Sequence, residues 1–321
     1  MDLNHIQTLV QADFAKVDVL IDQCLDSPIK LIPQVAKHLI HSGGKRLRPL
    51  IALLSAAIFN CQAKHVPLAA ILELIHTATL LHDDVIDTSS LRRGKKTANT
   101  LWGNPASILV GDFLYSRAFQ LMVEINHPRV LRSLADATNR LSQAEILQLV
   151  NHHNPQLSEA DCLHIIEGKT AILFSIAAQQ PVVLANGSEA AIAAMAQYGL
   201  HLGMAFQLVD DTLDYTGTTC RLGKSKGDDI AEGKTTLPLI LALRTGNTKQ
   251  VQLIEEAITQ GNRNHLEAIT DILQATGAIR STLMRAQEQA KKAIERLQFI
   301  PSSCYKEALI SLAEFTVART Y

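Results

Sequence analysis

Residues 67–87 read PLAAILELIHTATLLHDDVID, a long apolar segment that ends in three aspartates. Apolar residues occupy nearly every face of a helix drawn through this segment, which predicts a buried helix at the centre of the fold. A second apolar segment, over 188–216, carries an acidic cluster of the same spacing near its end. Helical periodicity of apolar residues continues through most of the remaining chain. The sequence therefore predicts an all-α fold.

The composition also favours helices. The chain has 321 residues, of which 47% are hydrophobic and 4% aromatic, with 16 glycines and 10 prolines. So few glycines and prolines provide few of the turns that separate neighbouring strands. The pattern predicts helices over residues 3–20, 33–43, 49–59, 67–87, 105–124, 128–151, 158–185, 188–216, 235–245, 248–260, 263–276, 278–297 and 304–319. We expect them to form one all-α domain over residues 1–321.

Charge and cysteine content exclude several classes of protein. Thirty Lys and Arg against 31 Asp and Glu give a net charge of −1, which argues against a general nucleic-acid binder. The five cysteines form no CxxC pair, which argues against a disulfide framework or a structural zinc site and favours a reducing cytosol. The chain begins with no signal-peptide pattern, and no run of about 18 apolar residues predicts a transmembrane segment. We expect a cytoplasmic protein.

The two acidic clusters are DDVID at 83–87 and DDTLD at 210–214. Residues four apart share a helix face. Asp83 and Asp87 can therefore hold one ion or two adjacent ions, and Asp210 and Asp214 can do the same from the second helix. Asp84 and Asp211 are rotated by about 100° and are expected to serve as outer partners of a ligand or of a basic side chain.

Six carboxylates at the ends of two apolar helices would repel one another unless cations lay between them. All-oxygen ligation favours Mg²⁺ or Mn²⁺, and Mg²⁺ prefers to complete its shell with substrate phosphates. The pattern therefore predicts a diphosphate substrate. The alternative to a binding site is that the two clusters are acidic helix ends facing solvent. The C-terminal end of a helix carries a partial negative charge, which disfavours aspartates there unless they have a function.

Basic residues gather near these clusters, in GGKRLRP at 43–49, in RRGKK at 92–96 and at Lys224, Lys226 and Lys234. Cations beside the free amides of a helix start make an anion site. A nucleic-acid patch at RRGKK is disfavoured because the chain is neutral and no aromatics are interleaved. The GKT triplets at 168–170 and 233–235 are no P-loops, because Leu163 and Asp228 stand where the first glycine belongs.

Histidines allow one further interpretation. His82-Asp83 is compatible with an HD-type phosphohydrolase, but that reading leaves the second aspartate cluster without a role. His76 and His82 are six residues apart and do not share a helix face, which argues against a paired metal site. His152 and His153 are expected to face solvent.

Taken together, these segments resemble the trans-polyprenyl diphosphate synthases over essentially the whole chain. The segments that carry the resemblance are GGKRLRP (43–49), HTATLLHDDVID (76–87), RRG (92–94), GDFL (111–114), GKTA (168–171), FQLVDDTLD (206–214) and GDD…EGKTTLP (227–238). The resemblance implies a large helical bundle around a central cavity, and a homodimer. It is strongest to the bacterial long-chain branch, which implies a C40 all-trans product for a quinone side chain, delivered to the membrane.

The resemblance also implies roles for individual residues. Two or three Mg²⁺ ions, or Mn²⁺, would be bound by Asp83, Asp87 and Asp210, with Asp84, Asp211 and Asp214 completing the acidic walls. Isopentenyl diphosphate would be held by Lys45, Arg48, His76 and Arg93. The allylic substrate, such as farnesyl diphosphate, would be held by Arg92, Lys169, Thr170, Gln207, Lys224 and Lys234. The catalytic groups are expected to be Lys169 and the aspartates Asp83, Asp84, Asp87, Asp210 and Asp211.

One departure from the family pattern is Glu167-Gly168, where bulkier residues are expected before Lys169. The chemistry that the family implies is metal-assisted ionisation of the allylic C–O bond, attack by the isopentenyl double bond, and loss of a proton to the departing diphosphate.

Product length follows from the helix that ends at Asp83. A growing chain would run down this helix past the small residues Ala78 and Thr79, with Phe119 and Met122 as candidate floor residues. The 16 residues back to Pro67 span ~24 Å, which accommodates roughly five or six isoprene units.

Three alternatives remain. The first is a geranylgeranyl synthase or a prenyl synthase of another chain length. A class I terpene cyclase shares the fold, but its second metal motif normally contains Asn or Asp, Ser or Thr, and Glu. A non-enzymatic lipid-binding subunit typically loses its aspartates, whereas all six are present here.

Overall fold

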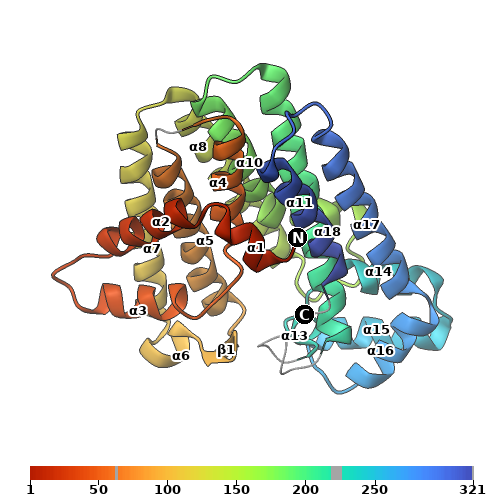
Figure 1. The fold of residues 1–321 in the computed structure, drawn as a ribbon. Coiled ribbons are helices and arrows are strands. Elements are labelled where there is room, and N and C mark those ends of the chain that lie inside the picture. Colours follow the sequence, from red (N-terminus) through yellow and green to blue (C-terminus); the bar gives the residue numbers. More distant parts are fainter. Residues whose placement is uncertain (62–63, 218–225, 320–321) are drawn as a thin grey trace.

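The computed structural model describes residues 1–61, 64–217 and 226–319. The first half of the chain forms helices joined by short loops and one small β-hairpin (Figure 1). Its elements are α1 (Leu3–Thr8), α2 (Gln11–Cys24), α3 (Leu31–Ile40), α4 (Leu47–Ile58), α5 (His65–Ile86), β1 (Leu91–Arg92), β2 (Lys95–Lys96), α6 (Ala98–Trp102), α7 (Asn104–Ile125) and α8 (Pro128–Val150).

The second half is also helical. Its elements are α9 (Glu159–Ile166), the π-helical turn η1 (Glu167–Ala171), α10 (Ile172–Leu184), α11 (Glu189–Thr216), α13 (Asp228–Ala231), α14 (Leu237–Thr245), α15 (Thr248–Gln260), α16 (Leu266–Ala275), α17 (Ala278–Arg296) and α18 (Cys304–Ala318). The all-α prediction is confirmed, and most predicted helices agree with the observed ones within a few residues. That one domain spans the whole of residues 1–321 stays a prediction.

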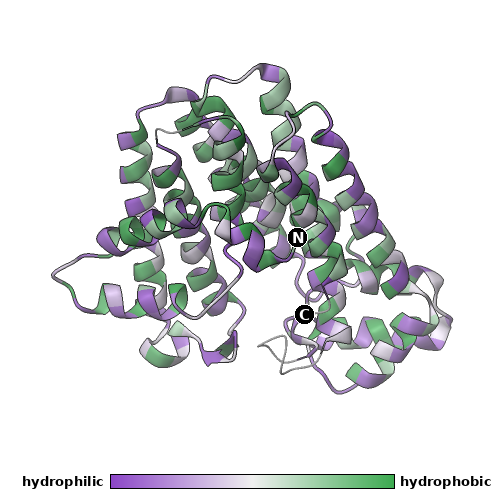
Figure 2. Ribbon diagram, in the orientation of Figure 1, coloured by the Kyte–Doolittle hydropathy of each residue, from purple (hydrophilic) through white to green (hydrophobic). Residues whose placement is uncertain are grey.

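Helix α5 lies at the centre, as its apolar faces predict. It packs against α2, α4, α7 and α10, and the side chains of Leu68, Ile71 and Ile75 are fully buried. Helix α11 packs against α10 and α17. Hydrophobic residues concentrate on the inner helices, and hydrophilic residues gather on the outer helices and loops (Figure 2). The two helices that end in aspartates are therefore held by the core.

A close approach of α11 to η1 and α10 aligns two segments of the site. A Cβ atom at Gly203 of α11 would lie 2.5 Å from the Cα of Ala171. Only glycine allows backbones to come this near. This approach brings Lys169 and Thr170 beside the acidic end of α11.

The structure departs from the predicted elements in several places, and the short helices α6 and α13 lie where no helix is predicted. The first predicted helix breaks at Leu9–Val10 into α1 and α2. The segment 158–185 contains the η1 turn, whose extra residue rotates Lys169 relative to a regular helix. RRGKK forms the tight hairpin β1–β2, in which Arg93 and Gly94 both have positive φ, as a two-residue hairpin turn of this type requires.

Among the described residues, α11 is the one helix long and apolar enough to cross a membrane. More than half of its apolar window is buried against other helices. In this structure α11 is a core helix of the bundle.

Candidate active site

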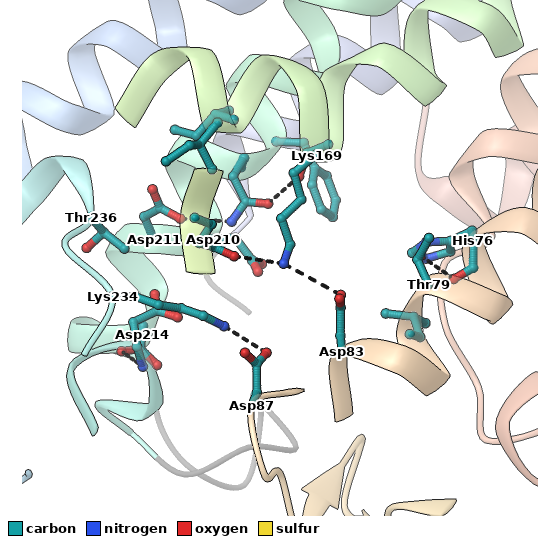
Figure 3. A pocket seen from close by; sticks show the side chains of 18 of the residues that line it. His76, Thr79, Asp83, Asp87, Lys169, Asp210, Asp211, Asp214, Lys234 and Thr236 are labelled. Atoms are coloured by element: carbon teal, nitrogen blue, oxygen red, sulfur yellow. Dashed lines mark hydrogen bonds and ion pairs between the residues drawn. The ribbon is translucent and has the colours of Figure 1, made fainter. Parts of the chain in front are cut away.

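A cavity of about 740 Å³, called here the first cavity, lies between the ends of α5 and α11. Its walls come from the start of α4, from α5, the β-hairpin, α8, η1, α11, the segment before α14 and Arg319. The aspartates of α5 face those of α11 across this space (Figure 3). The structure thus unites two motifs that lie more than 120 residues apart in sequence.

The first acidic motif divides its three carboxylates between two roles. Asp83 and Asp87 line the first cavity. Asp84 is 1% exposed and accepts a hydrogen bond of 2.8 Å from Arg92 Nε. Because residues i and i+4 share a face and i+1 does not, this division is the one that the spacing predicts.

All three aspartates of the second motif line the first cavity. Thr170 donates to Gln207 Oε1 at 2.9 Å, and Gln207 Nε2 donates to Asp211 Oδ1 at 2.8 Å. Burial, with the nearby charge of Asp229, raises the pKa of Asp211 well above its ordinary value. Asp210 lies 3.4 Å from Arg319 Nη1 and stays half exposed.

Asp214 is held from the loop that follows α11. Its two carboxylate oxygens accept hydrogen bonds from the backbone N–H groups of Asp228 and Asp229, at 3.2 and 3.3 Å. The GDD segment therefore fixes the orientation of this carboxylate.

Two lysines reach across the cavity to the first motif (Figure 3). Lys169 Nζ donates to Glu145 Oε2 at 2.6 Å and to Gln148 Oε1 at 2.8 Å, and it lies 3.7 Å from Asp83 Oδ2. Lys234 Nζ lies 2.7 Å from both Asp87 Oδ2 and Glu232 Oε2.

The protonation of these groups follows from their surroundings. Burial alone would lower the pKa of Lys169 and Lys234, but the neighbouring carboxylates outweigh it and raise both pKa values, so both ammonium groups stay charged. Burial and then the charge of Asp83 raise the pKa of Glu145 to about 7. Burial also raises the pKa of Glu232 to about 7.

The donor set suits a hard divalent cation. Oxygen atoms are the ligands that Mg²⁺ takes in proteins, and the facing carboxylates supply them. In residues 1–61, 64–217 and 226–319, however, no three His, Cys, Asp or Glu side chains converge closely enough to hold an ion alone. The carboxylates form two facing walls, so an ion between them needs further oxygens from water or from a bound ligand.

A second set of cations lines another part of the first cavity. Lys45, Arg48, His76 and Arg93 all line it, as expected. Arg48 lies over the ring of Phe174, 4.7 Å from its centroid. Burial, followed by the charges of Arg48 and Arg93, lowers the pKa of His76 well below its ordinary value, so the imidazole is neutral. Burial and then Arg319 lower the pKa of Lys45 to about 8.

The adjacent residues Arg92 and Arg93 point to different partners. Arg92 pairs with Asp84 of the first acidic motif. Arg93 donates to the carbonyl of Gly43 and lies 3.3 Å from the hydroxyl of Ser42. The left-handed backbone of Arg93 in the hairpin turn separates the two guanidinium groups.

Several residues of the site were not predicted from the sequence. Glu73, Glu145, Gln148, His152, Asp229, Glu232 and Arg319 all line the first cavity. Only Asp229 and Glu232 belong to a quoted motif, the GDD…EGK segment, which could have found them. His152 corrects the expectation that both neighbouring histidines face solvent, because the end of α8 turns it toward the cavity; His153 is exposed. Lys224 lies outside the described residues.

A second cavity, of about 880 Å³ and with a mostly apolar lining, lies between α5, α7 and α8. Thr79, Asp83 and Glu145 line both cavities. Phe119 lines the second cavity and is 44% exposed in the single chain.

The expected route along α5 needs correction. Ala78 and Met122 are absent from the described lining of both cavities and are buried in the core. Helix α5 packs against α2, α4 and α10, and its N-terminal residues Leu68, Ile71 and Leu72 are fully buried. The open space runs instead between α7 and α8.

Comparison with known proteins agrees with this geometry. The family model for polyprenyl synthetase matches residues 29–276. The octaprenyl diphosphate synthase of Haemophilus influenzae is 47% identical, over 100% of this chain and 98% of that protein. That of Escherichia coli is 45% identical over 99% of each.

A solved structure has the same fold throughout. The polyprenyl synthase of Caulobacter crescentus, crystallised with calcium and isoprenyl diphosphate, superposes with a TM-score of 0.96 and 43% identity. The match covers 100% of this chain and 98% of that one.

Proposed function

Because the chain belongs to the polyprenyl synthetase family, it is a prenyltransferase, and we propose that it is an octaprenyl (C40) all-trans-polyprenyl diphosphate synthase. It would add isopentenyl diphosphate units to an allylic diphosphate such as farnesyl diphosphate. The observation that carries this proposal is the pair of facing aspartate motifs in a cavity that also holds a separate set of cations. That arrangement suits two diphosphates bound side by side.

We divide the cations between the two substrates by what each one contacts. Lys169 and Lys234 contact Asp83 and Asp87, so they are suited to the diphosphate that lies against the acidic walls, the allylic one. The matching site for isopentenyl diphosphate is formed by Lys45, Arg48, His76 and Arg93. A neutral His76 can donate one hydrogen bond to a phosphate oxygen without adding charge.

Mg²⁺ is the cofactor that the oxygen donors favour. Asp83, Asp87 and Asp210 would hold it, with Asp214 and Asp211 beside them; two or three ions, or Mn²⁺, are expected. When bound, it would neutralise the leaving diphosphate and so assist ionisation of the allylic C–O bond. Asp84 faces Arg92, so we assign it to positioning that arginine rather than to the ion.

The chain's own residues then protect the reacting centre. The charged lysines hold the diphosphate on one side, while the apolar surface toward the second cavity excludes water from an allylic cation. The isopentenyl double bond attacks that cation, a proton leaves to the departing diphosphate, and an allylic diphosphate longer by one isoprene unit results. The lengthened chain would enter the second cavity, whose volume suits a long product.

The remaining expectations concern assembly and location. Exposed apolar side chains on α7 and α8, among them Leu109, Val123, Ile146 and Val150, support a homodimer that covers these helices. We further propose that the enzyme works in the cytoplasm and delivers its product, a quinone side-chain precursor, to the membrane.

A shorter-chain synthase, a cyclase or a non-enzymatic subunit would behave differently in one assay. The purified chain is incubated with Mg²⁺, farnesyl diphosphate and labelled isopentenyl diphosphate. Incorporation of label into long acid-labile products supports the proposal. Products that stop at C20 identify a geranylgeranyl synthase, a cyclic hydrocarbon without label identifies a cyclase, and no product identifies a binding subunit.

A further inference from the structure

The two cavities meet at three side chains. Thr79 and Asp83 come from α5, Glu145 comes from α8, and all three line both cavities. The first cavity holds the charged groups, and the second is mostly apolar. A hydrocarbon chain that runs from a diphosphate at Asp83 into the second cavity would therefore pass beside Thr79 and Glu145, the other two side chains that line both cavities.

Glu145 is held firmly at this junction. Its Oε2 accepts a 2.6 Å hydrogen bond from Lys169, and Gln148, one turn further along α8, accepts another from the same ammonium group. The contact with Lys169, which lines the first cavity, draws the Glu145 carboxylate toward that cavity. The methylene groups of Glu145 are then the part of the side chain that is left to face the passage.

Backbone packing fixes the distance between α8 and η1. A Cβ atom at Gly168 would lie 2.7 Å from the Cβ of Ala144 and 3.2 Å from the carbonyl oxygen of Arg140. Glycine at this position therefore allows α8 to approach η1 and brings Glu145 within reach of Lys169. This contact also explains the glycine that departs from the expected motif.

We propose that Glu145 is a specificity-determining residue for product length, because it forms with Thr79 the gate between the two cavities; this role rests on the function proposed above. The hydrogen bond from Lys169, which a glutamine at position 145 could also accept, holds the gate open. The side chain at position 145, opposite the small Thr79, sets how much hydrocarbon passes into the second cavity. Gln148 lines the first cavity and, among the described lining residues, does not belong to the second.

Three variants test whether Glu145 controls product length or only binds Lys169. Glu145→Phe adds bulk at the gate, Glu145→Gln keeps the shape without the charge, and Gln148→Leu removes a Lys169 partner away from the gate. Each is incubated with Mg²⁺, labelled isopentenyl diphosphate and either geranyl or farnesyl diphosphate. The readout is the distribution of product lengths, which does not depend on the overall rate.

Glu145→Phe is expected to shorten the main product well below C40, since the gate lies about one helical turn from Asp83 and the added ring blocks further growth. Glu145→Gln and Gln148→Leu are expected to lower the rate and to keep the wild-type length. An unchanged distribution for a folded Glu145→Phe enzyme would overturn the gate. The same follows if Gln148→Leu shortens the product as much as Glu145→Phe does.

Bulk can also be added after folding. Glu145→Cys is treated with methyl or benzyl methanethiosulfonate, and wild-type protein treated in the same way controls for the native cysteines. The benzyl adduct is expected to shorten the product relative to the methyl adduct, and equal lengths would contradict the gate. If wild-type protein itself fails to elongate farnesyl diphosphate, the proposed function fails rather than the gate.

Discussion

Lys234 Nζ donates a 2.7 Å hydrogen bond to Asp87 Oδ2 and so joins two residues that lie 147 positions apart. The lysine follows the second aspartate motif, and the aspartate ends the first (Figure 3). The protein's own cation thus balances part of the acidic wall. The two motifs line the same cavity, so a substitution in either motif should change binding and turnover in that cavity.

Removal of one cavity-facing carboxylate from either wall should abolish most activity. Asp83→Ala or Asp210→Ala is expected to lower kcat by several orders of magnitude, because each removes an oxygen ligand for the ion. Asp136→Ala, at an exposed position on α8, is the matched control and should retain wild-type turnover. Circular dichroism should show all three folded. Near-normal turnover of a folded double variant would refute the metal assignment.

The two neighbouring arginines should affect different substrates. Arg93→Ala is expected to raise the KM for isopentenyl diphosphate more than that for the allylic substrate, and Arg92→Ala the reverse, because their guanidinium groups point to different partners. Arg92→Ala should also lower the melting temperature, since buried Asp84 loses an ion-pair partner. Initial rates with each substrate varied in turn provide the test. Equal effects of both variants on both KM values would be inconsistent with this division.

Affinity for isopentenyl diphosphate should fall at alkaline pH. The pKa of Lys45 is lowered to about 8, chiefly by burial, so its ammonium group is charged below that pH and increasingly neutral above it. The KM for isopentenyl diphosphate is therefore expected to rise as pH increases through about 8. Lys45→Arg should move this rise to higher pH, because a guanidinium keeps its charge. A wild-type KM that stays flat from pH 7 to 9.5 would exclude Lys45 from the site.

Position 79 should control chain length, whereas position 78 should control stability. Thr79→Tyr adds bulk where both cavities are lined and is expected to shorten the product to about C15–C20. Ala78→Tyr, although only one residue away, overpacks a fully buried position and should destabilise the fold by about 1–3 kcal/mol. Chromatography of products and thermal unfolding of both variants distinguish these effects. A stable Ala78→Tyr enzyme with shortened products would instead support the predicted path of the growing chain along α5.

Much of the fold could be predicted because its signals are local. The apolar faces of α5 and α11 and the spacing within each aspartate motif depend on neighbouring residues alone. The same spacing correctly separates Asp83 and Asp87, which face the cavity, from Asp84, which faces Arg92. The hairpin at 91–96 was missed because a Lys/Arg-rich loop gives no alternation of apolar and polar residues.

The less predictable features depend on packing between distant segments. A single glutamate on the polar side of α8 resembles any solvent-facing residue, yet Glu145 meets Lys169, 24 residues later. That contact depends on the close approach of Gly168 to Ala144, which no local sequence pattern predicts. In the same way, the sequence of α5 cannot tell which of its faces other helices cover. The predicted tunnel therefore followed α5, whereas the open space lies between α7 and α8.

The most direct measurement is the length of the wild-type product. The purified chain is given Mg²⁺, farnesyl diphosphate and excess labelled isopentenyl diphosphate, and the dephosphorylated products are separated by reversed-phase chromatography. The expected result is a main C40 all-trans-polyprenol, formed only when the divalent cation is present. Products that end at C20 or shorter, or chain growth that persists after complete removal of the metal by a chelator, would contradict the account.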